Sequence, residues 1–348
     1  GHMMKRALTG IQASGKQHLG NYLGVMQSLI ELQEQCQLFV FVADLHSITV
    51  DFQPQALKQN NFDLVRTLLA VGLDPQKACL FLQSDLLEHS MMGYLMMVQS
   101  NLGELQRMTQ FKAKKAEQTR NPNGTLNIPT GLLTYPALMA GDILLYQPDI
   151  VPVGNDQKQH LELTRDLAQR IQKKFKLKLR LPQFVQNKDT NRIMDLFDPT
   201  KKMSKSSKNQ NGVIYLDDPK EVVVKKIRQA TTDSFNKIRF ASKTQPGVTN
   251  MLTILKALLK EPVNQSLTNQ LGNDLEAYFS TKSYLDLKNA LTEATVNLLV
   301  NIQRKREQIS REQVFNCLQA GKNQAQATAR TTLALFYDGF GLGSQNIK

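Results

Sequence analysis

Two short groups of polar residues in this chain carry side chains suited to holding a polyphosphate. The first is His18-Leu19-Gly20-Asn21, and the second is Lys202-Met203-Ser204-Lys205-Ser206. The second group brings two ammonium groups close together, which suits negative charge that develops on a leaving group. Either group alone is a weak signal, since a lysine-rich loop is usually a solvated surface. Together, in this order, they predict a site that holds the phosphates of ATP from two sides.

The first group lies where a predicted strand turns into a helix. Residues 6–11 read as a short strand, and a helix is expected from about Leu19, because apolar residues recur there at helical spacing. The free N–H groups and the dipole of a helix start favour phosphate. His18 and Asn21 share one face, and Gly20 leaves room for a ligand beside the backbone. For His18 alone, an ordinary surface histidine is an equally good interpretation.

Strands and helices alternate through the first half of the chain. Residues 38–43 and 79–82 are short apolar runs typical of buried strands. Helical patterns fill residues 53–72, 86–105, 131–146 and 156–172. This alternation predicts an α/β fold with a Rossmann-like parallel sheet, whose ligands bind beyond the carboxyl ends of the strands. The pattern beyond residue 217 is helical almost throughout, which indicates a smaller all-helical domain.

The net charge of +13 is concentrated in the C-terminal part of the chain. Residues 201–348 contain 22 Lys and Arg against 12 Asp and Glu, whereas residues 1–200 contain 21 against 18. A basic segment remote from a phosphate site indicates a polyanionic partner, nucleic acid first, although a need for solubility would also explain the charge. The longest apolar run is too short to span a bilayer. Three widely spaced cysteines without metal-ligand spacing indicate a reducing cytoplasm.

One carboxylate lies in an unusual place for its charge. Asp142 falls on a strongly apolar helical pattern, with Leu138, Met139, Leu145 and Tyr146 as its neighbours on the helix surface. A buried carboxylate needs a hydrogen-bond donor. An internal hydrogen bond is the ordinary explanation, and the N–H group of a ligand that enters an apolar pocket is the alternative. Of the histidines at positions 18, 46, 89 and 160, only the one at position 89 falls outside the segments expected at the site.

Seven segments of the chain occur in the order that is typical of one enzyme family. They are residues 9–15, 18–21, 44–46, 103–112, 133–136, 149–160 and 202–206. On these segments the chain resembles the bacterial tryptophanyl-tRNA synthetases, which are class I aminoacyl-tRNA synthetases. The block from Asp149 to His160 is the most specific of them, whereas the two motifs predicted to bind phosphate, residues 18–21 and 202–206, would alone indicate only class I. The helical C-terminal part resembles the family least.

The resemblance implies an ATP site and its residues. The catalytic residues, which hold the phosphates as pyrophosphate leaves, would be Lys202, Lys205, His18 and Asn21. The other ATP-binding residues would be Gln12, Ser14, Gly20, Gly154, Asp156, Ile193, Met203, Ser204 and Lys112. Within this set, Gly154 and Asp156 would line the ribose, and Ile193 and Met203 would flank the adenine. Mg²⁺ would be held mainly by phosphates and water, since the sequence offers no acidic cluster for it.

The resemblance also implies a pocket for L-tryptophan, in which Asp142 would accept the indole N–H. The ring would be lined by Leu8, Met139, Val151 and Val153. The ammonium and carboxylate groups would be oriented by Gln12, His46, Tyr135 and Gln157. The chain departs from the family pattern at two places. Leu8 stands where many relatives have an aromatic ring, and Ser207 follows the lysine group where many have aspartate.

The implied reaction is the ATP-dependent ligation of tryptophan to tRNA(Trp). The tryptophan carboxylate is ionised at neutral pH and needs no general base, so catalysis rests on positioning and charge stabilisation. A terminal ribose hydroxyl of the tRNA, usually the 2′-OH in class I, then attacks the activated carbonyl. The alternatives are a tyrosyl-tRNA synthetase, another class I-like nucleotidyltransferase, and an RNA-binding paralogue without catalysis. The intact catalytic residues argue against the last of these.

Four segments are expected from the pattern and the resemblance together. Residues 1–190 would form the Rossmann-like catalytic domain, and residues 191–216 a linker with the mobile lysine loop. Residues 217–300 would form the helical tRNA-binding domain. Residues 301–348 would be C-terminal helices that can pack back on the catalytic domain. The resemblance further implies a symmetric homodimer in the cytoplasm, without a membrane.

Overall fold

The computed structural model describes residues 4–13, 15–117, 121–154, 157–186 and 192–348. Its centre is a five-stranded sheet with the order β3-β2-β1-β4-β5, in which every neighbouring pair is parallel. The strands are β1 (Arg6–Ile11), β2 (Gln37–Val42), β3 (Ala78–Leu82), β4 (Ile150–Val153) and β5 (Gln183–Gln186). The predicted α/β fold with a parallel sheet is therefore confirmed.

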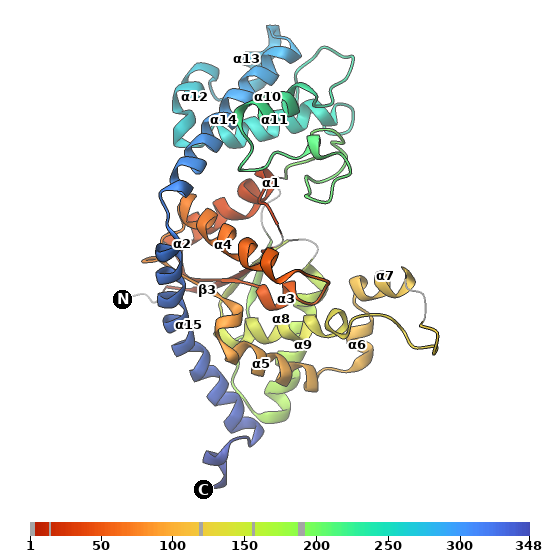
Figure 1. Ribbon diagram of the computed structural model, residues 1–348, viewed down its shortest axis with the longest axis vertical. Coiled ribbons are helices and arrows are strands. Elements are labelled where there is room, and N and C mark those ends of the chain that lie inside the picture. The colour runs from red at the N-terminus through yellow and green to blue at the C-terminus, as the bar shows by residue number, and fades with distance from the viewer. Residues whose placement is uncertain (1–3, 14, 118–120, 155–156, 187–191) are drawn as a thin grey trace.

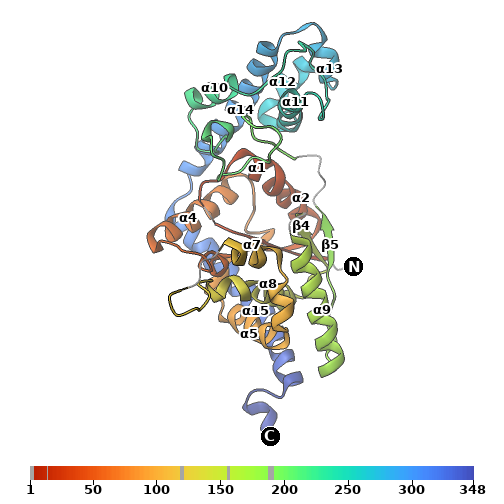
Figure 2. The same ribbon diagram turned by 90° about the vertical axis from the view of Figure 1, so that its right-hand side faces the viewer.

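The inner strands are buried on both faces, as their nearly continuous apolar sequences require. Successive side chains point to opposite faces of the sheet. Ala7 and Leu38 accordingly lie in one hydrophobic cluster, whereas Leu8 and Phe39 lie in the other. The first cluster is covered by α2 (Gln27–Gln35) and α4 (Pro54–Ala70). The second is covered by α5 (Leu87–Gln99), α8 (Thr130–Tyr146) and α9 (Lys158–Phe175), and Figure 2 shows α9 beside β5.

One predicted helix is wrong in its extent. The pattern over residues 86–105 forms two helices, α5 and α6 (Leu102–Gln106). The break falls at Asn101, whose backbone N–H donates to Glu104 Oε1 at 2.8 Å. A side chain three residues into a helix that reaches back to the capping residue is a start signal. The chain therefore ends one helix and begins another, although the apolar spacing continues across the break.

The C-terminal half is helical, as expected from its pattern, and most of it forms the upper part of Figure 1. Its helices are α10 (Lys220–Arg228), α11 (Pro246–Leu258), α12 (Gln265–Leu271), α13 (Leu275–Tyr278), α14 (Tyr284–Glu307) and α15 (Arg311–Phe340). Within the part of the chain that the structure describes, no helix is both long and apolar enough to cross a membrane.

The last helix, α15, runs down beside the sheet and contacts the edge strand β3 (Figure 1). A Cβ atom added at Gly321 would lie 1.8 Å from the carbonyl oxygen of Leu80, so only glycine allows this approach. The Cys79 thiol donates to the Gly321 carbonyl at 3.2 Å. The C-terminal helix is thus part of the sheet's own packing.

Candidate functional site

The start of the first helix is built by His18 and Asn21. The backbone N–H of Asn21 donates to His18 Nδ1 at 3.3 Å, and the backbone N–H of His18 donates to Asn21 Oδ1 at 3.0 Å. The two side chains therefore cap α1 (Leu19–Asn21), which continues through residues 22–26 into α2. Because Nδ1 accepts a hydrogen bond, the ring proton of neutral His18 sits on Nε2.

The lysine group lies against this helix start. Burial, together with the nearby charges of Lys202 and Lys205, lowers the pKa of His18 to about 4. His18 is therefore neutral at neutral pH and can donate from Nε2. A Cβ atom at Gly20 would lie 3.6 Å from the Cβ of Met203 and 2.9 Å from the His18 ring. The structure thus brings together residues 18–21 and residues 202–206, the two segments that were predicted to bind phosphate.

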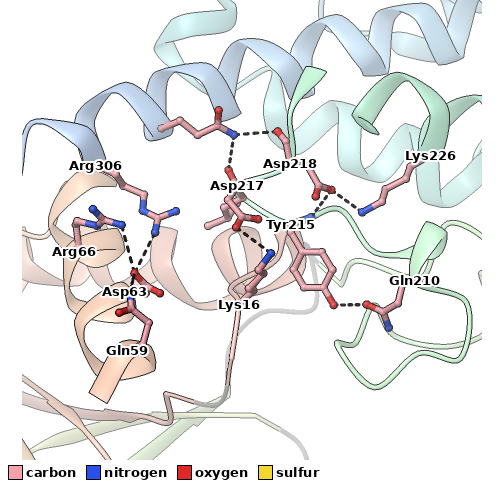
Figure 3. Close-up of polar contacts among 12 residues, drawn as sticks. Lys16, Gln59, Asp63, Arg66, Gln210, Tyr215, Asp217, Asp218, Lys226 and Arg306 are labelled. Carbon is pink, nitrogen blue, oxygen red and sulfur yellow. Dashed lines mark hydrogen bonds and ion pairs between the residues drawn. The ribbon is translucent and has the colours of Figure 1, made fainter. Parts of the chain in front are cut away.

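Backbone hydrogen bonds fix the relative position of the two groups. The N–H of Leu19 donates to the carbonyl of Ile214 at 2.8 Å, and the N–H of Leu216 donates to the carbonyl of Gln17 at 3.0 Å. The segment that follows the lysine group is therefore paired with the residues around His18. Figure 3 shows an ion pair beside this pairing, in which Lys16 Nζ lies 3.4 Å from Asp217 Oδ2.

A second ionic contact holds α14 near the same place. In Figure 3, Arg306 Nη2 lies 3.7 Å and Arg66 Nη2 lies 3.4 Å from Asp63 Oδ1. Asp63 belongs to α4, one of the helices that cover the sheet, and Arg306 lies in the last turn of α14. The helical part is thus joined to the sheet part by charged contacts beside the segments predicted to bind phosphate.

The loop that carries the lysines is anchored through a buried carboxylate. Asp195, only 2% exposed, accepts hydrogen bonds from the backbone of Phe197 and Asp198 and from the Ser207 hydroxyl at 2.9 Å. Gly212 also lies against it, since an added Cβ would be 1.9 Å from Asp195 Oδ1. The family departure at Ser207 therefore has a structural use, because its hydroxyl donates where an aspartate would oppose the Asp195 charge.

Asp142 is completely buried and has three hydrogen-bond partners from distant parts of the chain. Gln83 Nε2 donates to Asp142 Oδ2 at 2.8 Å, and His46 Nε2 lies 3.0 Å from the same oxygen. His89 Nδ1 lies 2.7 Å from Asp142 Oδ1. Burial alone would raise the pKa of Asp142, but the hydrogen bonds from His46 and His89 hold it below its usual value. The carboxylate is therefore ionised and can only accept.

Gln83 and His89 contact Asp142, although the sequence did not indicate either of them. His89 lies outside the predicted site segments, yet its side chain contacts Asp142 directly. Gln83 follows β3 directly, at the carboxyl end where ligands of parallel sheets bind. That position was the one signal that could have revealed it. The backbone N–H of Leu45 donates to Gln83 Oε1 at 3.0 Å, which directs the amide nitrogen to Asp142.

Two aromatic residues extend this cluster. The Tyr135 hydroxyl lies 2.9 Å from His160 Nε2. The Tyr135 ring lies edge-on to the His46 ring, with centroids 5.9 Å apart. Tyr135, His46 and Asp142 therefore form one continuous group, and His160 contacts it through the Tyr135 hydroxyl.

The remaining predicted residues divide by location. Leu8, Val151 and Val153 are buried in the cluster that contains α8, and Met139 is partly buried against it. Ile193 and Met203 are buried and joined by a backbone hydrogen bond of 3.0 Å. The exposed residues are Gln12 after β1, Lys112 on α7 (Thr109–Glu117) and Gly154 after β4.

Gln157 is partly exposed and precedes α9, where its N–H donates to the Gly154 carbonyl at 3.1 Å. Ser14 and Asp156 lie outside the described residues. Among the residues that are described, no group of three or more His, Cys, Asp or Glu could hold a metal ion. The protein side chains of the described part therefore do not form a metal site of their own.

Known proteins resemble this chain over its whole length. It is 68% identical over 345 residues to the tryptophan–tRNA ligase of Mycoplasma genitalium, covering 99% of each chain. The crystal structure of tryptophanyl-tRNA synthetase from Mycoplasma pneumoniae matches with 97% identity and a TM-score of 0.91, covering 99% of this chain and all of that one. That from Campylobacter jejuni, complexed with ADP and tryptophan, matches with 28% identity and a TM-score of 0.78, covering 97% and 100%.

A family model agrees with these matches. The model for class I tRNA synthetases of the W and Y type matches residues 3–300, which include both segments predicted to bind phosphate and Asp142. The matched region covers most of the chain, and the fold is the one that the sequence predicted. This chain therefore belongs to the class I tRNA synthetases of the W and Y family.

Proposed function

We propose that this chain activates L-tryptophan with ATP, releases pyrophosphate, and transfers the tryptophan to tRNA(Trp). The observation that carries the proposal is the contact between the His18 helix start and the Lys202–Ser206 loop, on the same rim of the sheet as the buried Asp142. The relatives support tryptophan over tyrosine, since four curated proteins that are 40% to 68% identical to this chain are tryptophan–tRNA ligases.

ATP binds where residues 18–21, at the start of the first helix, meet the loop of residues 202–206. Lys202, Lys205 and Ser204 hold the pyrophosphate as its charge develops, and neutral His18 donates from Nε2 to a phosphate oxygen. Asn21 acts differently from a simple phosphate ligand, because its side-chain oxygen is occupied by the His18 N–H. It positions the His18 backbone and leaves its amide N–H₂ group for the nucleotide.

The rest of the ATP molecule extends towards β4 and the start of the lysine loop. Gly154 and Asp156 contact the ribose, and Ile193 and Met203 flank the adenine. The remaining contacts are made by Gln12, Ser14, Gly20 and Lys112. Mg²⁺ bound together with ATP would be held mainly by the phosphates and by water, in keeping with its preference for water ligands.

Tryptophan binds with its indole N–H on Asp142. A carboxylate has about four acceptor positions, and described protein residues use two on Oδ2 and one on Oδ1. We assign the remaining position on Oδ1 to the indole N–H, which is a donor without acceptor capacity. The ring packs on Leu8, Met139, Val151 and Val153. The amino-acid ammonium and carboxylate are oriented by Gln12, His46, Tyr135 and Gln157.

Chemistry then follows from position and charge. The ionised tryptophan carboxylate attacks the α-phosphorus of ATP, the bond to the bridging oxygen breaks, and pyrophosphate leaves with the electron pair. Lys202 and Lys205 stabilise the charge on the leaving group. The 2′-OH of the terminal tRNA ribose next attacks the adenylate carbonyl, and AMP leaves. The chain needs no general base for the first step.

The basic C-terminal half is proposed to bind the tRNA. Residues 217–300 form the tRNA-binding domain, residues 301–348 pack on the catalytic domain of residues 1–190, and residues 191–216 carry the mobile lysine loop. Net positive charge on this half supports a polyanionic partner. The protein acts in the cytoplasm as a homodimer.

The test is ATP–pyrophosphate exchange measured with each of a panel of amino acids. Exchange that depends on tryptophan supports the proposal. Exchange with tyrosine and not tryptophan would overturn the substrate and leave class I chemistry intact. Absence of exchange with every amino acid would favour an RNA-binding protein without catalysis. Charging of purified tRNA(Trp), compared with tRNA(Tyr), then checks the second step.

A further inference from the structure

The Asp142 carboxylate is held by a hydrogen-bonded chain that ends at Tyr146. His89 Nδ1 lies 2.7 Å from Asp142 Oδ1, and His89 Nε2 lies 2.6 Å from the Tyr146 hydroxyl. His89, Asp142 and Tyr146 are each 0% exposed. None of the proposed steps uses His89 or Tyr146. A fully buried imidazole with a different partner on each nitrogen has a fixed orientation and a fixed set of protons.

The direction of each hydrogen bond can be assigned. The ionised carboxylate only accepts, so His89 Nδ1 carries a proton and donates to Asp142. Burial raises the pKa of Tyr146, and the Asp142 charge raises it further, so the phenol keeps its proton. In the neutral imidazole with its proton on Nδ1, Nε2 is an acceptor, so the Tyr146 hydroxyl donates to it. Tyrosine thus selects the histidine tautomer, and the histidine donates to the carboxylate.

Neighbouring rings lock the geometry of the chain. The His89 ring lies 5.5 Å from the Phe41 ring and 5.8 Å from the Phe81 ring, centroid to centroid. The Tyr146 ring lies 5.2 Å from the Phe39 ring. These phenylalanines come from β2 and from the edge strand β3. The donor that faces Asp142 Oδ1 is therefore packed against buried rings of two neighbouring strands.

We propose that His89, held in one tautomer by Tyr146, is a positioning residue that aims the last acceptor position of Asp142 Oδ1 at the indole N–H of tryptophan. This inference rests on the proposed function. His89 does not touch the substrate. It occupies one position on Oδ1, so that the other is the one open to a donor, and it stops the carboxyl group from rotating. Its effect is specific to the N–H group and leaves the ring contacts unchanged.

Two variants of the same residue separate positioning from support of the fold. In His89→Asn, the amide nitrogen takes the place of Nδ1, keeps the donor to Asp142 and loses Tyr146. In His89→Gln, the longer side chain takes the place of Nε2, keeps Tyr146 and loses the donor to Asp142. Each variant loses one buried hydrogen bond and keeps one, so a purely structural role predicts equal behaviour.

The readout is discrimination between tryptophan and β-benzothienylalanine, in which sulfur replaces the indole N–H. The ratio of the two kcat/KM values in ATP–pyrophosphate exchange measures the N–H contribution. We expect His89→Gln to lower this ratio by about tenfold, the factor for roughly one hydrogen bond to a charged group, and His89→Asn to keep it within about twofold. The KM for ATP should be unchanged in both.

A ratio that falls equally in both variants, or in neither, would overturn the inference. If ATP–pyrophosphate exchange by the unvaried protein did not depend on tryptophan, the proposed function would be wrong, and this inference with it. NMR of the unvaried protein with ¹⁵N-labelled histidine provides a measurement that does not depend on variants that fold. His89 should show a slowly exchanging Nδ1–H proton that shifts when tryptophan is added. An Nε2–H tautomer would rule the arrangement out.

Discussion

The backbone N–H of Leu19 donates to the carbonyl oxygen of Ile214 across 2.8 Å. This bond joins the start of the first helix to the segment that follows the lysine loop, although 195 residues separate the two in sequence. The two segments predicted to bind phosphate, residues 18–21 and 202–206, therefore belong to one local structure. The loop between Met203 and Gly212 is held near both ends, because the Met203 N–H donates to the Ile193 carbonyl and the Ile214 carbonyl accepts from Leu19, so the lysines lie close to the His18 helix start.

Replacement of either lysine should affect the chemical step more than tryptophan binding. We expect Lys202→Ala and Lys205→Ala each to lower the exchange rate on the order of 10²-fold, because the lost ammonium stabilises charge that develops only as pyrophosphate leaves. Tryptophan affinity, measured by calorimetry, should be little changed. Lys208→Ala is the matched control, since this exposed lysine lies in the same loop and has no proposed role. Equal losses of rate and tryptophan affinity would point to a folding defect instead.

Asp142→Asn should weaken tryptophan binding by about 1.5–3 kcal/mol, the range for hydrogen bonds to charged groups. The variant's amide nitrogen would take the Oδ1 position and donate to His89, whose tautomer can reverse because the Tyr146 hydroxyl also accepts. The second N–H of that amide would then face the indole N–H, and two donors cannot bond. We therefore expect tryptophan affinity to fall and ATP binding to persist.

Thermal unfolding distinguishes this role from a structural one. Reversal of the His89 tautomer keeps most of the buried polar groups paired, so the melting temperature of Asp142→Asn should fall only slightly. A variant that binds tryptophan normally but has a much lower melting temperature would show that Asp142 is a structural residue, which accepts hydrogen bonds only from its three protein donors.

An exposed apolar stripe on α5 supports the proposed homodimer. Leu87, Tyr94 and Val98 recur at helical spacing and are 80%, 54% and 49% exposed. Such a stripe on a soluble domain commonly marks an interface. We expect light scattering to give a dimer mass at micromolar concentration, and Val98→Glu to shift it towards the monomer. Val300→Glu, at a similarly exposed valine on α14, should leave the dimer intact. A monomer mass for the unvaried protein would contradict the assignment.

Much of the fold could be predicted because its signals are local. The strand at residues 6–11 was found with the right bounds, since a short apolar run between turns is a property of neighbouring residues. The break at Asn101 was missed, because the apolar spacing hides a capping bond. The roles given to individual site residues remain predictions, and those for Ser14 and Asp156 fall outside the described residues.

Asp142 marks the boundary between the two kinds of information. The sequence by itself determined that this carboxylate lies on an apolar helix face and needs donors, because helical spacing decides which neighbours a residue has. Only the tertiary structure decided that the donors are His46, Gln83 and His89, which lie 96, 59 and 53 residues away. Those contacts exist because the parallel strands before His46 and Gln83 end at one rim and because α5, which carries His89, packs on α8. Side chains that meet in this way share no spacing along the chain.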